Sequence, residues 1–383
     1  MEKMNALVFD TSKQQWEKSR GFLKVEVPIP RLEKSDADSV IVKVRYAGVC
    51  GSDRGIWSRQ AFREQILGSL KNKKKNYRVI GHEFCGEIAE LGPEAAKRYK
   101  LKRGDFVSAE SHVVCNRCFQ CRHGQKNVCT NEKILGISHD GCFAEYLKVP
   151  GHIIWKTDVK KIRPEVAAIQ EPFGNAVHAV SKTDVRGKTV AIFGLGPIGL
   201  FALLIAKGLG AKKVIGIAPK NNSQLIAKKL GIDELITVSK EKNLSFEHDP
   251  EIVAKIKEAT DEVGADVSLE MAGYNSSVNT AIHATRRGGD VILFGIKSGN
   301  FVLENYNALI VKGQTIHLVI GRELWKTWET TKSLLENKKN KIQDQIYNVI
   351  LEKGKGTILS IDDYSMEAFE QKLATKTKFL LSF

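Results

Sequence analysis

The sequence predicts an α/β protein whose second half is a doubly wound parallel sheet and whose first half is mostly β. Three observations support this fold class. Residues 189–193 form a β-prone run that leads into glycines at spacing G-x-G-x-x-G and then into an apolar, helix-compatible run at 200–209. Strand-like and helix-like segments alternate beyond it, as in parallel sheets covered by helices. Before it, Pro28 and Pro30 interrupt a region of short extended runs.

Bulk properties restrict the class of protein further. The 383 residues suffice for two domains, and 42% hydrophobic with 27% charged residues is typical of a globular protein. The first residues lack the apolar segment of a signal peptide, and no other long apolar run follows, so we expect a cytoplasmic protein with no membrane partner. The net charge of +15 permits an anionic substrate or nucleic acid. Because the chain has no basic helix with interleaved aromatic residues, we expect no nucleic-acid partner.

The first half carries metal-ligating residue types after predicted strands. Residues 40–46 form a predicted strand that ends near Cys50, while His82 and Glu83 follow Gly81, which permits a backbone turn. Thiolate, imidazole and carboxylate together suit a catalytic zinc whose fourth position stays open. The alternatives are a buried core thiol and a core histidine beside an exposed carboxylate.

Residues 54–78, between these two motifs, are strongly basic. They include the lysine run 73–75 and only one acid, Glu64. We predict a solvated surface loop, with steering of an anionic substrate as the alternative.

Four cysteines are crowded into residues 115–129. Their spacing is C-x2-C-x2-C-x7-C, and four thiolates can close a tetrahedral sphere around one structural zinc. The alternative is a redox-active C-x-x-C pair, which normally lies at a helix start in a βαβ unit that we do not find here. The predicted ligands are Cys115, Cys118, Cys121 and Cys129, whereas Cys85 and Cys142 are predicted core residues.

The glycine loop predicts a dinucleotide site. Gly194 and Gly196 let the backbone approach a pyrophosphate, and Gly199 lets the following helix pack on the strand. A tight turn without a ligand is the alternative, whereas Pro197 and Lys207 argue against a membrane span.

The next strand, 214–217, indicates which dinucleotide is preferred. An acid is expected near its end to bind the ribose of NAD, but the sequence there is Ala218-Pro219-Lys220. The missing carboxylate and the lysine favour NADP or dual preference, unless Lys220 is only a solvated turn residue. The predicted cofactor contacts are Gly194, Gly196, Pro197, Ile198, Gly199, Ala218, Lys220 and Gly295.

The remaining elements follow in order. A turn and strand at 141–147 precede a helix at 171–180, whose first turn holds Glu171 and Pro172. Proline is favoured there, and a carboxylate complements the helix dipole. Further helices are predicted at 224–230, 250–260 and 325–337, and further strands at 265–269, 291–295, 315–320 and 378–381.

In their order along the chain, these motifs resemble the zinc-dependent medium-chain dehydrogenases. The resemblance implies a GroES-like catalytic domain at residues 1–178 with a zinc lobe at about 110–130, a Rossmann NAD(P)-binding domain at 179–321, and a return to the catalytic domain at 322–383, including the helix at 325–337. It also implies a homotetramer. The stretches that carry it are Cys50-Gly51-Ser52-Asp53, Gly81-His82-Glu83, the four cysteines, Glu171-Pro172 and the glycine loop.

The resemblance also implies roles for site residues. A catalytic zinc would bind Cys50, His82 and Glu83, and Glu171 would lie beside the metal and be able to enter its sphere. Ser52 would relay the proton of a secondary alcohol that gives hydride to the nicotinamide. With the cysteine lobe, two zinc ions per chain are expected.

Within this family the chain is most similar to the threonine 3-dehydrogenases, in particular at His112, 141–147, 172–178, 269–273 and 321–325. It departs from them at Gly55, where they carry a histidine, at Asp362-Asp363, where they carry a His-Arg pair, and in its longer basic segment. The substrate therefore stays open between a threonine-like alcohol and a polyol or sugar phosphate of the sorbitol dehydrogenase type. A zinc-ribbon protein that binds nucleic acid and a cofactor-binding scaffold without catalytic zinc are the alternatives from other classes.

Overall fold

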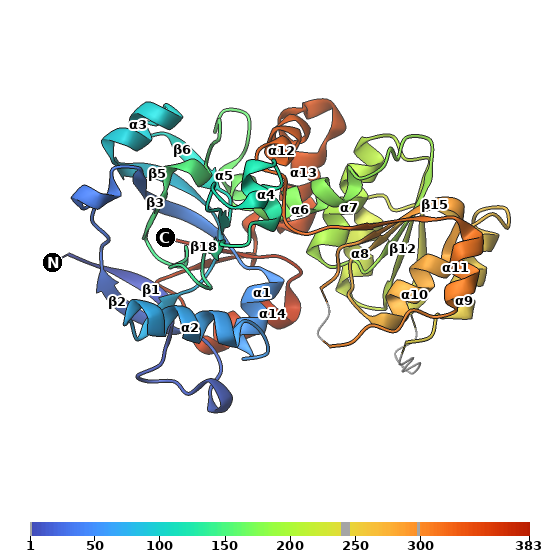
Figure 1. The fold of residues 1–383 in the computed structure, drawn as a ribbon, viewed down its shortest axis with the longest axis horizontal. Coiled ribbons are helices and arrows are strands. Elements are labelled where there is room, and N and C mark those ends of the chain that lie inside the picture. Colours follow the sequence, from blue (N-terminus) through green and yellow to red (C-terminus); the bar gives the residue numbers. More distant parts are fainter. Residues whose placement is uncertain (1, 239–245, 297–298) are drawn as a thin grey trace. The chain divides into compact units, whose positions relative to one another are not determined.

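A computed structural model describes residues 2–238, 246–296 and 299–383 (Figure 1). The chain forms two compact units, one made of Met1–Pro172 and Ile346–Phe383 and the other of Phe173–Gln345. The first unit is thus assembled from two separate parts of the chain. Its borders lie after residues 172 and 345, whereas the sequence placed them after residues 178 and 321.

Helix α12 (Lys326–Glu336) corresponds to the helix predicted at 325–337. That helix was expected to return to the first domain, but it belongs to the second unit. The preceding Arg322 is buried and donates to Asn175 Oδ1 at 2.7 Å, within the same unit. Thr331 of the helix lies close to Gly174 of the same unit, because a Cβ on Gly174 would be 3.5 Å from the Thr331 hydroxyl. The buried face of the helix consists of Thr327, Trp328, Thr331, Leu334 and Leu335.

The first unit is built on two main sheets. One has the order β2-β1-β4, and the other has the order β10-β6-β5-β3-β18-β17, with β9 also paired to β3. Strand β3 is central because it pairs with β5, β9 and β18. The strands are β1 (Lys3–Asp10), β2 (Leu23–Pro28), β3 (Ser39–Gly48), β4 (Tyr77–Val79), β5 (Glu83–Leu91), β6 (Phe106–Ala109), β9 (Tyr146–Pro150), β10 (Ile154–Lys156), β17 (Ile358–Ser360) and β18 (Leu380–Ser382).

The basic segment 54–78 is not the surface loop that the sequence predicted. It contains most of α1 (Gly51–Trp57) and all of α2 (Arg63–Lys73). Ile66 and Leu70 of α2 are buried. The many basic residues around them concealed this apolar side of the helix in the sequence. Arg78 is fully buried and donates to Asp140 at 2.5 Å. Other helices of this unit are α3 (Pro93–Tyr99), α4 (Phe119–Arg122), α5 (Pro164–Ala167) and α14 (Met366–Thr375).

The second unit contains the predicted doubly wound sheet. Its strand order is β13-β12-β11-β14-β15-β16, and every neighbouring pair is parallel. The order reverses between β11 and β14, and ligands of such sheets bind at the carboxyl ends of the strands beside this point. The strands are β11 (Thr189–Phe193), β12 (Lys213–Pro219), β13 (Glu234–Val238), β14 (Ala265–Glu270), β15 (Thr285–Leu293) and β16 (Thr315–Leu318).

Helices alternate with these strands, so the α/β fold class is confirmed (Figure 1). Within the described ranges, no helix combines the length and the apolar composition of a bilayer-crossing segment. The helices are α6 (Gln170–Val180), which begins in the first unit, α7 (Pro197–Gly208), α8 (Asn222–Lys229), α9 (Pro250–Glu258), α10 (Asn275–Ala284), α11 (Tyr306–Lys312) and α13 (Ile342–Gln345).

Candidate functional site

The first unit brings together three residues that the sequence predicted as metal ligands. Cys50 lies just after β3 and caps α1, while His82 and Glu83 lie at the start of β5. The candidate ligand atoms of Cys50, His82 and Glu83 lie within 4.8 Å of one another. His82 is 6% exposed and Glu83 is fully buried. We call these three residues the ligand cluster.

Two glycines make room for the ligand cluster. Gly81 has φ +89°, and a Cβ there would lie 2.1 Å from the ring of Phe143. The turn that the sequence predicted at Gly81 is therefore present, because this backbone conformation favours glycine. Gly48 pairs with Glu83 across the sheet, and a Cβ there would lie 2.1 Å from Glu83 Oε2. The sequence did not indicate this second clearance.

Asp53 orients the ligand cluster from the first turn of α1. Its Oδ2 accepts from the backbone N–H of Cys50 at 2.8 Å, and its Oδ1 lies 3.5 Å from His82 Nδ1. His82 Nε2 thus remains available to a metal, and Ser52 Oγ lies 3.4 Å from that nitrogen. Burial lowers the pKa of His82, but the nearby Asp53 carboxylate and Cys50 outweigh it and raise the pKa well above its usual value.

Lys378 is a component of the site that sequence reasoning missed. Its buried ammonium forms an ion pair with Glu83 Oε2 and donates to the carbonyl of Val49 at 2.9 Å. Burial raises the pKa of Glu83 and Lys378 opposes this rise, while Glu83 raises the pKa of Lys378 against its own burial. The sequence feature that could have indicated this role is the position of the lysine, directly before the apolar residues 379–381.

Glu171 lies near the ligand cluster but is not one of its three members. It is 5% exposed, in the first turn of α6, and accepts from Ser111 Oγ at 2.7 Å. Its charge contributes to the raised pKa of Glu83, after burial. The position suits both expectations for Glu171, a carboxylate beside a metal and a carboxylate that complements a helix dipole.

The chemistry of the ligand cluster fits a zinc ion. A thiolate, an imidazole and a carboxylate leave one of four tetrahedral positions open. Glu83 Oε1 is buried and has no hydrogen-bonding partner among the described residues, and a buried carboxylate oxygen is costly unless a cation or donor meets it. A metal ion would remove that cost.

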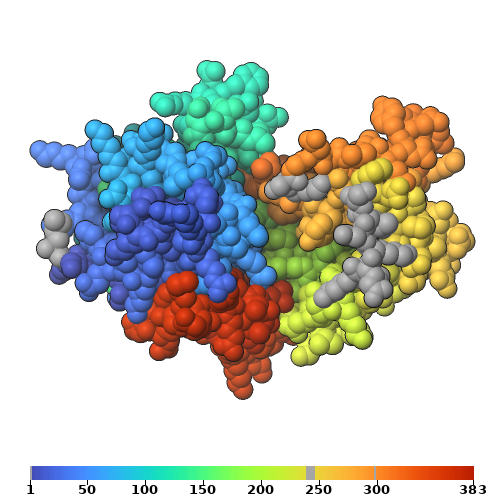
Figure 2. Space-filling model, turned by 90° about the horizontal axis from the view of Figure 1, so that it is seen from below, coloured from blue at the N-terminus to red at the C-terminus, as the bar shows by residue number. Residues whose placement is uncertain are grey.

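The four cysteines of the lobe also come together. Their sulfur atoms lie within 4.8 Å of one another, and all seven cysteines of the chain are free of disulfides. The short strands β7 (His112–Val113) and β8 (Lys133–Ile134) pair at the base of the lobe, which projects from the surface in Figure 2 (turquoise). The backbone N–H of Cys121 is the largest of the influences that lower the pKa of Cys118 to about 5. Such a thiol is readily available as a thiolate ligand.

In the second unit, the glycine loop has the geometry expected of a phosphate cradle. Gly194 has φ +94°, and a Cβ on Gly199 would lie 2.0 Å from Gly194 O, so strand and helix meet backbone to backbone. Gly196 caps α7 and is exposed, with open space around a Cβ placed there. Pro197 is the first helical residue and Ile198 the second. The helix N-terminus, with its free N–H groups, suits an anion.

The other predicted cofactor residues lie at the carboxyl ends of β12 and β15. Ala218 is 1% exposed, and its carbonyl accepts from Gln224 Nε2 at 2.8 Å. Lys220 is exposed just beyond β12. Gly295 lies against Gly273, because a Cβ there would be 2.3 Å from the Gly273 nitrogen.

Two protein families match the chain. Residues 36–159 match the alcohol dehydrogenase GroES-like domain, and residues 197–337 match the zinc-binding dehydrogenase family. The L-threonine 3-dehydrogenase of Pyrococcus horikoshii is 37% identical over 353 residues, which cover 92% of this chain and 92% of that protein. The solved alcohol dehydrogenase TADH from Thermus sp. ATN1 is 25% identical, with a TM-score of 0.79 over 99% of each chain. A zinc-binding dehydrogenase of Sinorhizobium meliloti 1021 bound to NADP shares the fold, with 22% identity and a TM-score of 0.76 over 100% of each chain.

Proposed function

The chain belongs to the zinc-dependent medium-chain dehydrogenases, and from this premise we propose that it oxidises the secondary hydroxyl of L-threonine. As a family member it is a zinc-dependent alcohol oxidoreductase that acts on CH–OH donors with a nicotinamide cofactor. The observation that carries threonine as substrate is the 37% identity to a threonine 3-dehydrogenase along 92% of the chain. The ligand cluster supplies the matching chemistry.

Each residue of the site has a separate role in the proposed oxidation of the alcohol. A zinc ion held by Cys50, His82 and Glu83 would supply a Lewis acid that lowers the pKa of the substrate hydroxyl, and the nicotinamide would supply the hydride acceptor. Asp53 and Lys378 hold two of the ligands in place, as partners behind metal ligands commonly do. Glu171, held by Ser111, adds a carboxylate beside the cluster. Ser52 takes the hydroxyl proton and passes it toward solvent.

A substrate screen tests the proposed function. Zinc-loaded protein is assayed with NAD and with NADP against L-threonine, 2,3-butanediol, sorbitol and a sugar alcohol phosphate. We expect the highest kcat/KM for L-threonine, and its mirror image D-threonine is the matched control. A higher kcat/KM for a polyol or its phosphate would replace threonine and leave the zinc dehydrogenase chemistry in place.

Two observations weigh against threonine and therefore leave the second candidate, a polyol or sugar phosphate dehydrogenase, in place. The histidine of threonine dehydrogenases is replaced by Gly55, and a Cβ at this position would lie 2.9 Å from Ala61 Cβ. A histidine would therefore require α1 and the following turn to shift. Asp362 and Asp363 are exposed, so the expected basic pair is replaced by negative charge.

We also propose that the four-cysteine lobe holds a second, structural zinc. Cys118→Ser should then lower the zinc content from two ions per chain toward one, because three thiolates no longer close a tetrahedral sphere. Elemental analysis of dialysed protein measures this. Cys85→Ala, which alters a buried thiol outside both clusters, is the control and should keep both ions. Two ions in Cys118→Ser would contradict the structural site.

We further propose that the enzyme uses NADP at least as well as NAD. Lys220 is exposed beyond β12, and residues 218–220 include no carboxylate that would repel a 2′-phosphate. Lys220→Asp should shift the ratio of kcat/KM values toward NAD by about tenfold, because it removes a cation and adds an acceptor for the ribose hydroxyl. Lys228→Asp, an exposed lysine on α8, is the control. A wild-type KM that is much lower for NAD than for NADP would overturn this proposal.

Finally, we propose a homotetramer in which the open edge of β16 is an interface. Strand β16 ends the sheet formed by the described residues, and on this strand Leu318 is 81% exposed and Ile316 is 42% exposed. Exposed apolar side chains beside an unpaired strand edge commonly mark association surfaces. Light scattering should give the mass of four chains, and Leu318→Lys should give a smaller species. A monomeric wild type at all concentrations would exclude the tetramer.

A further inference from the structure

The second unit contains a polar pocket that neither the ligand cluster nor the glycine loop uses. Its volume is about 600 Å³. It lies at the start of β15, beside Thr285, which is the amino end of the parallel sheet, whereas the glycine loop follows the carboxyl end of β11. The lining residues include Lys257 on α9, His283 on α10, Arg286 and Arg287 on β15, and Lys312 on α11.

The cations of this pocket are not matched by carboxylates. Among the pocket's lining residues, Glu262 is the single carboxylate. Within the described part of the chain, no ion pair involves Lys257 or Arg287, and both side chains are exposed. The pocket therefore carries an excess of positive charge.

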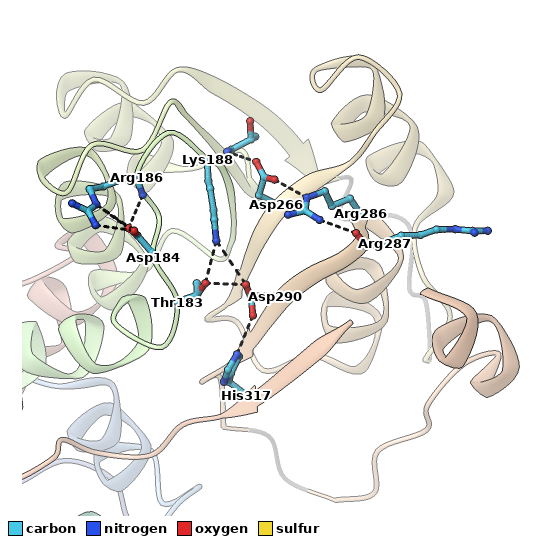
Figure 3. Close-up of polar contacts among 10 residues, drawn as sticks. Thr183, Asp184, Arg186, Lys188, Asp266, Arg286, Arg287, Asp290 and His317 are labelled. Atoms are coloured by element: carbon cyan, nitrogen blue, oxygen red, sulfur yellow. Dashed lines mark hydrogen bonds and ion pairs between the residues drawn. The ribbon is translucent and has the colours of Figure 1, made fainter. Parts of the chain in front are cut away.

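Three neighbouring cations on the same edge of the sheet form ion pairs with carboxylates, unlike Lys257 and Arg287 of the pocket. Figure 3 shows Arg186 with Asp184, Lys188 with Asp290, and Arg286 with Asp266, the last at 2.6 Å. Arg287 extends away from this network in the same view, and its carbonyl accepts from Arg286 Nη1. These three cations have a carboxylate partner, whereas Lys257 and Arg287 have none among the described residues. Their charges are therefore available to an anion from outside the chain.

Lys312 is a further cation of the pocket, and hydrogen bonds fix the position of its ammonium group. Its Nζ donates to the carbonyls of Ile282 at 2.9 Å and His283 at 2.7 Å, at the end of α10. Burial, and then the charges of Lys257 and Arg287, lower the pKa of Lys312 to about 8. An anion in the pocket would offset this mutual repulsion.

A metal ion is the competing occupant, because His248, His283 and Glu304 have ligand atoms within 4.8 Å of one another. The two imidazole rings, however, stack with centroids 4.1 Å apart and planes 17° apart. A metal must lie in the plane of each imidazole that binds it, and nearly parallel stacked rings cannot share one ion without rotating. Glu304 already accepts from His248 Nδ1 at 2.9 Å, and the adjacent cations would repel a metal.

We propose that this pocket binds an anion with several phosphate charges, through Lys257, Arg287 and Lys312. Guanidinium and ammonium groups form strong, charge-assisted hydrogen bonds with phosphate oxygens. The side chains come from three different elements, so they surround a volume instead of lining one helix face. The site is separate from the dehydrogenase reaction and does not depend on its substrate.

Calorimetric titration tests this proposal. Zinc-loaded protein saturated with NAD, so that the glycine loop is occupied, is titrated with inorganic pyrophosphate at low ionic strength. The variant Lys257→Gln/Arg287→Gln should weaken binding by about tenfold or more, because two charge-assisted contacts are lost. The matched control Lys338→Gln/Lys339→Gln removes the same charge from two exposed residues of the same unit and should bind as the wild type does. Both variants should keep the wild-type kcat and KM.

Other results of these titrations would overturn the proposal or identify the ligand more closely. Equal binding by both variants would place the anion elsewhere and overturn the proposal, as would wild-type protein that shows no saturable binding. ATP that binds more tightly than pyrophosphate, with the same loss in Lys257→Gln/Arg287→Gln, would identify a nucleotide as the source of the phosphates. An additional zinc ion that is lost in His283→Gln, without pyrophosphate binding, would replace the anion by a metal. Zinc content is measured after each titration, because pyrophosphate also binds zinc.

Discussion

Ser52→Ala should lower kcat by about 100-fold or more while the protein retains its zinc, because a positioned proton-transfer group contributes roughly that much. Ser52 Oγ lies 3.4 Å from His82 Nε2, the ring nitrogen that faces away from Asp53. The hydroxyl therefore lies next to the nitrogen that would bind zinc, without belonging to the ligand cluster. Its removal interrupts the proton path and leaves the ligand cluster complete.

The measurement is kcat and KM together with zinc content, for Ser52→Ala and for Ser58→Ala. Ser58 is exposed, and its hydroxyl donates to the carbonyl of Arg54 at 3.0 Å, on the same helix. The control should behave as the wild type does. Full turnover in Ser52→Ala with zinc bound would remove Ser52 from the mechanism, and a loss of zinc would show that it supports the metal instead.

Lys378→Met should weaken catalytic zinc binding by about 10- to 100-fold, the usual effect of removing a group that holds a metal ligand. It should also destabilise the protein by about 3–5 kcal/mol, because it leaves the fully buried Glu83 carboxylate without its ammonium partner. Without that partner, Glu83 Oε2 is free to turn away from Gly48. Zinc affinity measured by competition with a chelator, and denaturant unfolding, give the two values.

Two further variants separate the effect of Lys378 on zinc binding from its effect on protein stability. Lys376→Met is the control, because Lys376 is only partly buried and pairs with Glu352 at 2.8 Å. Glu83→Gln/Lys378→Met removes both buried charges and should regain most of the stability but not the zinc affinity. Wild-type zinc affinity in Lys378→Met would contradict a positioning role for this lysine.

The parts of the molecule that sequence reasoning predicted depend on local patterns. The glycine loop lies within a few residues of its strand and helix, and the four cysteines lie within residues 115–129. Their geometry follows from spacing alone. The alternation of strands and helices after residue 189 likewise predicted the parallel sheet.

The parts that were missed depend on packing between distant segments. Gly48 is needed because Glu83 Oε2 lies over it from a neighbouring strand, and nothing near Gly48 in the sequence indicates that contact. The basic residues of α2 concealed a helix whose buried positions are only Ile66 and Leu70. Helix α12 has a regular apolar face, but its composition does not tell which unit that face packs against.

The pairing of Glu83 with Lys378 also bears on how the protein is made. The two residues are 295 positions apart, and the whole second unit is encoded between them. At about 5–20 residues per second, the ribosome needs roughly 15–60 s to cover that interval. During this time the nascent carboxylate has no lysine to meet it, so the catalytic pocket matures last, after the nucleotide-binding unit has left the exit tunnel.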